Sequence, residues 1–246
     1  MTRKRRIGIV FALALLVVLP ACGGTTATQE DSTTTTSLEA VGDASGRPTG
    51  STALRLYGPT TAHIAPEAGA DVVTRLDART ELGSTTTLLV VEAQGDWLEV
   101  LLPIRPNGTT GWVRTAAGEL RTTDYRIDID LPNRRVTLFD AGKVVLNAVA
   151  AIGAPDTPTP TGDFFVTDLV ETGDPNGSYG DHAIGLSGHS NELTEFAGGD
   201  GQIGVHGTNQ PSSIGQAVSH GCVRLANDVV AELVQQVPLG TPVSVR

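Results

Sequence analysis

VHGTNQPSSIGQAVSHGCVRLAN, residues 205–227, places two histidines, His206 and His220, ahead of a lone cysteine, Cys222. The chain has only one other cysteine, Cys22, so no disulfide framework can form. Cysteine attacks as the thiolate, and its ordinary pKa of about 8.5 leaves only a few per cent ionised at pH 7. A neighbouring imidazole can remove the thiol proton. The stretch therefore predicts nucleophilic catalysis by Cys222.

Two other interpretations of these residues stay open. A lone cysteine is often a small buried hydrophobic residue, and a nearby histidine can belong to the core. A zinc site of His206, His220 and Cys222 is the other interpretation, but His220 and Cys222 are only one residue apart, which suits tetrahedral ligation poorly. We therefore expect no metal here.

Gly221, beside the cysteine, lets a substrate approach the backbone closely. The amides of Gly221 and Cys222 could then form an oxyanion hole, in which one donor lowers the barrier by about 2.7–4 kcal/mol.

The same stretch resembles the active-site signature of L,D-transpeptidases of the YkuD type, in which a histidine and a gap precede Ser/Thr-His-Gly-Cys, a hydrophobic residue, and Arg or Asn. TPTPTGDF at 157–164 resembles the upstream motif of that family, and VPLGTPVSV at 237–245 resembles its C-terminal end. The resemblance covers residues 123–246 and implies a catalytic domain there.

The resemblance implies the main catalytic roles. Cys222 is the expected nucleophile, and His206 is its general base, oriented by the backbone carbonyl of Gly207. His220 supports the thiol, and the amides of Gly221 and Cys222 hold the oxyanion.

Two further positions match the family motif. Arg224 is expected to be structural or to face a substrate carboxylate, and Ser219 is expected to position the loop at the substrate. We expect surface or loop positions for the other histidines, with the last two in a mobile lid: His63, His182 and His189. Tyr179 and Phe196 could line a groove or simply pack.

The activity that the resemblance implies is a peptidoglycan acyl transfer. Cys222 would form a thioacyl enzyme from a tetrapeptide stem, and an amine of a neighbouring stem would resolve it into a 3→3 crosslink. No metal or cofactor is needed, and carbapenems should acylate the thiol. An L,D-carboxypeptidase of the same fold, or a non-catalytic lipoprotein that binds the cell wall, are the alternatives.

Composition limits the partners and the fold class. The 246 residues carry a formal net charge of -10 and a pI near 4.9, which argues against nucleic acid, because no excess of basic residues can displace phosphate counterions. The 29 glycines and 14 prolines indicate a loop-rich, mainly β protein.

The N-terminus predicts an exported, lipid-anchored protein. Basic residues 3–6 precede an apolar run at 7–19, whose length as a helix, about 20 Å, suits a signal peptide better than a membrane span. The sequence Leu-Pro-Ala-Cys at 19–22 resembles a bacterial lipobox, so residues 1–21 would be removed and Cys22 lipidated; ordinary secretion is the alternative. The protein would then sit on the outer face of the cell membrane, facing the wall.

Between the anchor and the catalytic region we expect two segments. Residues 22–52 are rich in Thr, Ser, Gly and Ala and predict a disordered tether. Residues 53–120 predict a small β domain, in which GDWLEV and GTTGWV resemble bacterial SH3-like domains. Trp97 and Trp112 could form a wall-binding face, but we favour a role in a small core.

The catalytic region itself predicts a mainly β fold, a YkuD-type β-sandwich with a short helix. Residues 125–152 show three alternating apolar segments joined by short turns, which predicts an antiparallel meander. A helix is expected from Asn227, as its N-cap, until Pro238 and Gly240 end it.

Overall fold

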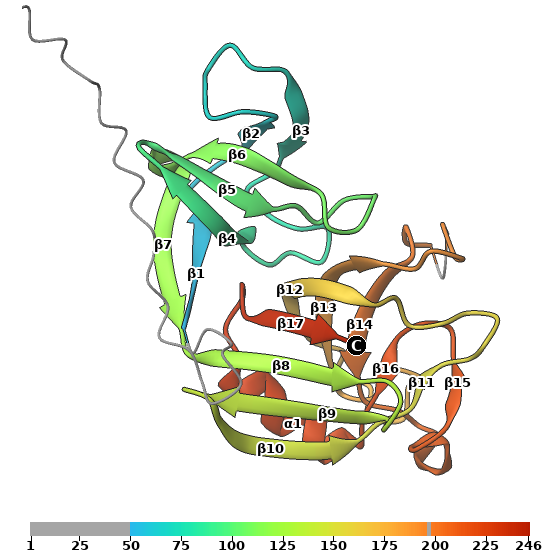
Figure 1. Cartoon of the computed structure of the whole chain (residues 1–246). Helices are drawn as coiled ribbons and strands as arrows, with labels where there is room; N and C mark the ends of the chain where they lie inside the picture. Colours follow the sequence, from blue (N-terminus) through green and yellow to red (C-terminus); the bar gives the residue numbers. More distant parts are fainter. Residues whose placement is uncertain (1–49, 196–197) are drawn as a thin grey trace, which may run out of the picture. The chain divides into compact units, whose positions relative to one another are not determined.

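The computed structural model describes residues 50–195 and 198–246 (Figure 1). The predicted signal peptide, the lipidated Cys22, most of the tether and Phe196 lie outside these residues. Within the described ranges, the one α-helix is too short to cross a membrane.

The first part of the described chain forms a seven-stranded sheet in the order β3-β2-β6-β5-β4-β1-β7. β1 begins at Ser51, two residues before the predicted start of the β domain at residue 53. The strands are β1 (Ser51–Leu56), β2 (Thr60–His63), β3 (Val72–Leu76), β4 (Thr87–Gln94), β5 (Trp97–Leu101), β6 (Thr110–Arg114) and β7 (Gly118–Thr123), with a 3-10 turn at Thr115–Ala117 before β7.

Alternating apolar residues give this sheet its core. Leu98 and Val100 of β5 are buried on one face, and Leu54 of β1 and Leu88 of β4 join them. The predicted turn between β4 and β5 is confirmed, and Gly95 there has φ of 56°, a conformation that glycine adopts without a steric penalty.

The preference for both tryptophans in a small core is confirmed for the burial of Trp97 but not for Trp112. Trp97 is buried, but outside the apolar cluster of this sheet. The Arg114 guanidinium lies 4.1 Å from its ring centroid, and the His63 ring meets it edge-on at 5.7 Å. Trp112 is only partly buried. Because side chains alternate between the faces of a strand, Trp97 and Trp112 share the face opposite to the core residues Leu98 and Val113.

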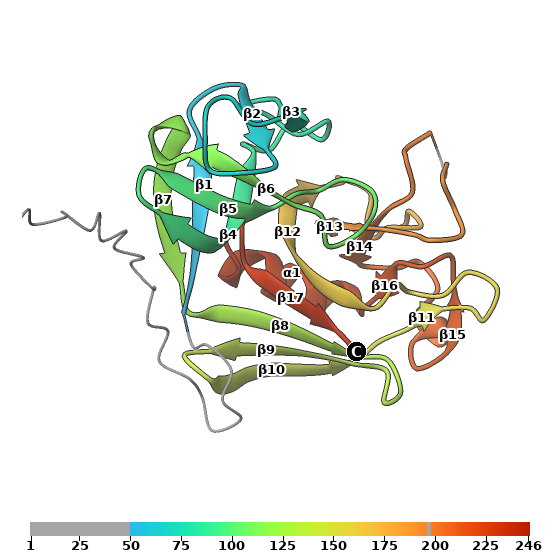
Figure 2. The ribbon, with the colours of Figure 1, turned by 45° about the horizontal axis from the view of Figure 1, so that its top comes forward.

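The second part forms an eight-stranded sheet in the order β10-β9-β8-β17-β12-β13-β14-β16, with a separate parallel pair of β11 and β15. Figure 2 shows these strands with the helix α1 behind β17. Their bounds are β8 (Tyr125–Asp130), β9 (Arg135–Asp140), β10 (Lys143–Val149), β11 (Ile152–Gly153), β12 (Gly162–Glu171), β13 (His182–His189), β14 (Gln202–His206), β15 (Ala217–Ser219), β16 (Val223–Arg224), α1 (Asn227–Gln236) and β17 (Pro242–Val245), with a 3-10 turn at Pro211–Ser213.

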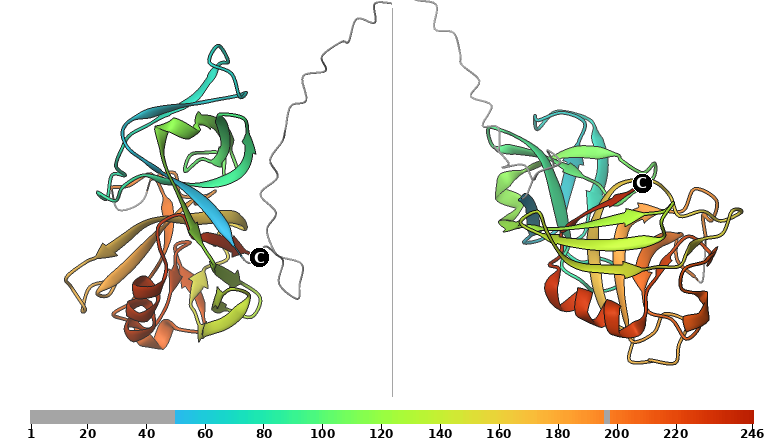
Figure 3. Two further views of the ribbon diagram at one scale, coloured as in Figure 1. Left: turned by 90° about the vertical axis from the view of Figure 1, so that its left-hand side faces the viewer. Right: turned by 60° about the horizontal axis from the view of Figure 1, so that its bottom comes forward.

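The predicted meander of β8, β9 and β10 is confirmed as antiparallel. β12 then joins the two halves of the sheet, because its first residues pair with β17 and its later ones with β13. One apolar cluster draws on both halves and on α1, which packs against β13 and β14 (Figure 3). The mainly β class with one short helix is therefore confirmed.

The helix α1 differs from the prediction at its start. Ala226 is the N-cap residue and has an extended conformation, and Asn227 is the first residue of the helix. Asn227 is not the cap because its side chain is engaged elsewhere: its Oδ1 accepts from the Thr208 amide at 2.7 Å.

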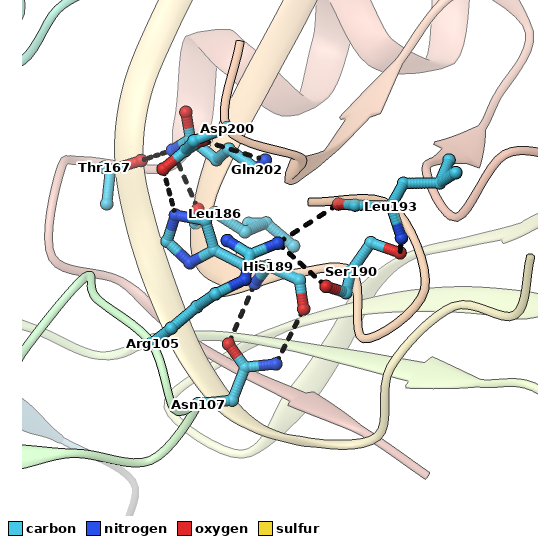
Figure 4. A network of polar contacts seen from close by, with 9 residues as sticks. All are labelled: Arg105, Asn107, Thr167, Leu186, His189, Ser190, Leu193, Asp200 and Gln202. Carbon is cyan, nitrogen blue, oxygen red and sulfur yellow. Dashed lines mark hydrogen bonds and ion pairs between the residues drawn. The ribbon is translucent and has the colours of Figure 1, made fainter. Parts of the chain in front are cut away.

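Several contacts join the seven-stranded sheet to the second part. Phe165 of β12 is fully buried within the apolar cluster of the first sheet. In the loop between β5 and β6, Asn107 pairs with both backbone groups of His189, at 2.9 and 2.7 Å (Figure 4). Arg105 donates to the carbonyls of Ser190 and Leu193. The first sheet is thus built into the same compact unit as the second.

Candidate active site

The predicted site residues meet in one pocket. It lies where the loop before β13, the end of β14 and the segment around β15 and β16 converge. The pocket is lined by Ser178, Tyr179, His206, Ser219, His220, Cys222 and Arg224.

Strand pairing brings together the two segments that carry His206 and Cys222. β14 and β16 run parallel, with His206 in register with Arg224, and the Leu225 amide donates to the His206 carbonyl at 2.9 Å. On the other side, Arg224 exchanges two backbone hydrogen bonds of 2.8 Å with Ala151. Cys222 directly precedes β16, so the sheet itself fixes the thiol relative to the imidazole.

His206 has the properties of a neutral base. Its side chain is buried, and its Nδ1 donates to the Gly207 carbonyl at 2.6 Å, as the resemblance implied. Burial lowers the pKa of His206 to about 4, and the nearby charge of Arg224 acts in the same direction, against the hydrogen bond to Gly207. The imidazole is therefore uncharged at pH 7, with its lone pair on Nε2.

Cys222 rests as a thiol rather than as a thiolate. Burial raises its pKa, although a backbone hydrogen bond from Gly204 and the charge of Arg224 act in the opposite direction. The pocket therefore holds a neutral thiol and a neutral imidazole at pH 7.

Ser219 holds the loop that carries Cys222. Its hydroxyl donates to the Cys222 carbonyl and accepts from the Gly221 amide at 3.2 Å, and Gly221 has φ of 111°. The expected loop-positioning role of Ser219 thus has a structural basis. The Gly221 amide, expected to be an oxyanion donor, is engaged within the loop, and the Cys222 amide remains as the other candidate donor.

The upstream motif supports the same loop from behind. The Thr157 hydroxyl and the Ala154 amide both donate to the Ser219 carbonyl, at 3.0 and 2.9 Å. Thr159 accepts from the Gly153 amide at 2.9 Å, which braces β11 beside β15.

Arg224 supplies positive charge to the pocket. Its Nε is buried and has no hydrogen-bond partner among the described residues. A buried guanidinium nitrogen without such a partner is suited to an anionic ligand. Within the same described ranges, no three His, Cys, Asp or Glu side chains form a group that could hold a metal ion.

The catalytic region matches known proteins. Residues 124–245 match the family model of the L,D-transpeptidase catalytic domain, YkuD. The chain is 37% identical over 124 residues to the putative L,D-transpeptidase YkuD of Bacillus licheniformis, which is 50% of this chain and 67% of that protein. The chain belongs to the YkuD family of L,D-transpeptidases.

Two further similar proteins are also named L,D-transpeptidases. The putative L,D-transpeptidase YkuD of Bacillus subtilis is 35% identical over 125 residues, covering 51% of this chain and 68% of that protein. The catalytic domain of the Enterococcus faecium L,D-transpeptidase acylated by ertapenem is 29% identical, covering 50% of this chain and 96% of that chain, with a TM-score of 0.36.

Within this L,D-transpeptidase domain, the sequence did not decide whether Tyr179 lines the site or only packs. The Tyr179 ring lies 4.6 Å from the His206 ring, centroid to centroid, at 56°. Burial and the nearby Cys222 raise the pKa of Tyr179. Tyr179 thus lines the pocket, and Ser178 beside it was not singled out. In the sequence, the only sign that the loop 172–181 reaches the pocket is its position directly before a strand.

The expected surface or loop position is wrong for His189, which is buried, whereas His63 and His182 are partly exposed residues at strand ends. His182 and His189 begin and end β13, since the segment pairs with β12 and β14 rather than forming a lid. His189 is buried and pairs with Asp200 at 2.9 Å. His63 is the last residue of β2, and its Nδ1 contacts the Ala70 carbonyl at 2.9 Å. His220 lines the pocket at an exposed position.

Proposed function

We propose that this protein is a peptidoglycan L,D-transpeptidase that forms 3→3 crosslinks through a thioacyl enzyme on Cys222. The observation that carries the proposal is the shared pocket of Cys222, His206 and Arg224, in a chain of the L,D-transpeptidase family. The donor is a tetrapeptide stem, and the acceptor is a side-chain amine of a neighbouring stem. The reaction needs no metal or cofactor.

The acylation step follows from the protonation states. Neutral His206 takes the thiol proton at Nε2 as the Cys222 sulfur attacks the carbonyl carbon of the third stem residue. The Cys222 amide donates to the oxyanion of the tetrahedral intermediate. The intermediate collapses, the carbon–nitrogen bond breaks, and the departing D-alanine amine takes the proton from His206.

The second step reverses the first with a new amine. The acceptor amine attacks the thioester carbonyl and gives a proton to His206, and the carbon–sulfur bond breaks. His206 then returns that proton to the Cys222 sulfur, which restores the resting thiol. One amide is exchanged for another, so no external source of energy is required.

Arg224 binds a carboxylate of the donor stem in this proposal. Its buried Nε has no hydrogen-bond partner within residues 50–195 and 198–246, and its charge lies close enough to lower the pKa values of His206 and Cys222. His220 supports the thiol from the exposed side of the pocket.

The proposed setting is the outer face of the cell membrane. The lipobox-like sequence around Cys22 and the tether after it would hold the catalytic region near the wall. The seven-stranded sheet corresponds to the segment that resembles SH3-like domains, and the proposed wall-binding face is the one opposite to its core, where Trp112 is partly exposed.

The test uses the full-length protein in detergent with disaccharide-tetrapeptide stems, read by mass spectrometry. A crosslinked dimer with loss of one alanine, absent from Cys222→Ala, is the expected product. Tripeptide without dimer would instead establish an L,D-carboxypeptidase. If neither forms and a carbapenem leaves Cys222 unmodified, a non-catalytic wall-binding lipoprotein is the remaining function.

A further inference from the structure

We propose that Asn227 is a positioning residue that holds Tyr179 against His206 and so sets the orientation and the shielding of the base. The inference rests on the proposed function, because it concerns how the base of that site is held. Asn227 does not line the pocket and touches no reacting atom.

The Asn227 amide joins two segments that are distant in sequence. Its Oδ1 accepts from the Thr208 amide at 2.7 Å, just after His206. Its Nδ2 donates to the Pro175 carbonyl at 3.2 Å, in the loop that carries Tyr179. The first residue of α1 therefore bridges the end of β14 and the loop between β12 and β13.

Two glycines allow the backbone to pack tightly against the Asn227 side chain. Gly180 follows Tyr179, and Gly207 follows His206. A Cβ atom on either would lie 2.4 or 2.3 Å from the Asn227 Oδ1, closer than real contacts allow. Gly180 also has φ of 64°, which favours glycine. The chain neighbours of Tyr179 and His206 thus pack on the same side-chain amide.

The result is an imidazole held on two sides. The Gly207 carbonyl accepts its Nδ1 proton at 2.6 Å, and the Tyr179 ring lies 4.6 Å from it, centroid to centroid. The titratable and charged groups that share the pocket with it are Tyr179 from the loop, Cys222 and His220 from the segment before β16, and Arg224 from β16.

Release of Tyr179 from its contact with His206 should raise the pKa of the imidazole. Burial is the main cause that keeps the pKa of His206 low, and the ring of the loop residue Tyr179 packs against the imidazole at 4.6 Å, tilted by 56°. Without the amide of Asn227, water would reach the imidazole. Its pKa would then rise toward the ordinary value near 6.5.

The experiment compares Asn227→Ala, Tyr179→Ala and the double variant in the full-length protein. The second-order rate of Cys222 acylation by a carbapenem is measured against pH, and the titration of His206 is followed by NMR. We expect each single variant to lower the rate about tenfold to a hundredfold and to raise the His206 pKa. The double variant should do no more than either alone, because both changes remove one contact.

Matched variants separate positioning from general damage. Asn209→Ala removes a hydrogen bond of 3.0 Å to the Asn176 carbonyl in the same loop but leaves the Thr208 bridge, so the His206 pKa should not move. Tyr179→Phe keeps the ring, so the pKa of His206 should stay at its wild-type value. If Asn227→Ala does not fold, Tyr179→Ala carries the test alone.

The outcomes distinguish the two proposals. An unchanged His206 titration in folded Asn227→Ala and in Tyr179→Ala, or equal shifts in Asn209→Ala, would overturn the positioning role. A wild-type protein that no carbapenem acylates at Cys222 would overturn the proposed function, and the NMR titration would still decide the role of Asn227.

Discussion

The Nδ1 of His206 donates to the carbonyl oxygen of Gly207 at 2.6 Å, within a single residue step of the chain. Because a carbonyl can only accept, this contact places the imidazole proton on Nδ1 and leaves Nε2 as the basic atom. The backbone thus does what a carboxylate does in other triads, but adds no negative charge. The absence of that charge is consistent with the low pKa of His206.

The acylation rate should remain high well below neutral pH. Since the pKa of His206 is about 4, the base stays unprotonated through pH 5, and the rate should fall only near pH 4. The measurement is the rate of Cys222 acylation by a carbapenem from pH 3.5 to 8. An acid limb near pH 6.5 would instead mean that the imidazole is solvated.

The same shift predicts a pH dependence of stability. The folded pKa of His206, about 4, lies below the unfolded value of 6.5, so between these values only the unfolded chain binds the proton. The free energy of unfolding should therefore fall as the pH drops from 6.5 to 4, by up to about 3 kcal/mol. Denaturant unfolding of His206→Gln, which cannot titrate there, should show a shallower fall. Equal pH profiles for both proteins would contradict the prediction.

Arg224→Gln should lower kcat/KM for donor stems that carry a terminal carboxylate. Loss of a charge-assisted hydrogen bond costs about 1.5–3 kcal/mol, which is roughly tenfold to a hundredfold in kcat/KM. A donor stem with its terminal carboxylate amidated should be poor for the wild type and no poorer for the variant. Arg121→Gln, an exposed arginine paired with Glu119, is the matched control. An equal loss for both donors would indicate that Arg224 acts on the thiol instead.

Ser219→Ala should loosen the nucleophile loop. The change removes one bond to the Cys222 carbonyl and leaves the Gly221 amide without its acceptor, at a cost of about 1–3 kcal/mol in stability. The melting temperature and the alkylation rate of Cys222 by iodoacetamide should both fall. Ser212→Ala, at an exposed position nearby, should change neither. A stable Ser219→Ala protein with wild-type alkylation would remove the positioning role of Ser219.

Asn107→Ala should destabilise the joined sheets. The side-chain amide satisfies both the amide and the carbonyl of His189, so its loss leaves two backbone groups without partners, at about 1–3 kcal/mol (Figure 4). Thr109→Ala, which removes only a bond within the same loop, is the control. Separate melting of two units in the wild type would contradict a single compact unit, and calorimetry reads this directly.

Local sequence patterns were enough for most of the strands. The alternation of apolar residues in the meander and the Gln94-Gly95-Asp96 turn predicted β8, β9, β10, β4 and β5 correctly, because these features depend on neighbours along the chain. They could not show which face of β5 meets the apolar cluster, so the core position predicted for Trp112 was wrong, and Trp97 is buried on the opposite face. The lid prediction was also wrong for His182 and His189, because both lie in β13, which β12 and β14 cover on its two edges.

By itself, the sequence determined the mainly β class, the family, and the grouping of His206, Ser219, His220, Cys222 and Arg224 as one candidate site. Residue type and spacing suffice for that, because the reactive groups lie within one short segment. Only the tertiary structure decided the protonation states, which follow from burial, and the engagement of the Gly221 amide by Ser219. It also decided the contact of Tyr179 with His206 and the bridge through Asn227, since these join segments far apart in the chain, and no local pattern encodes which of them will meet.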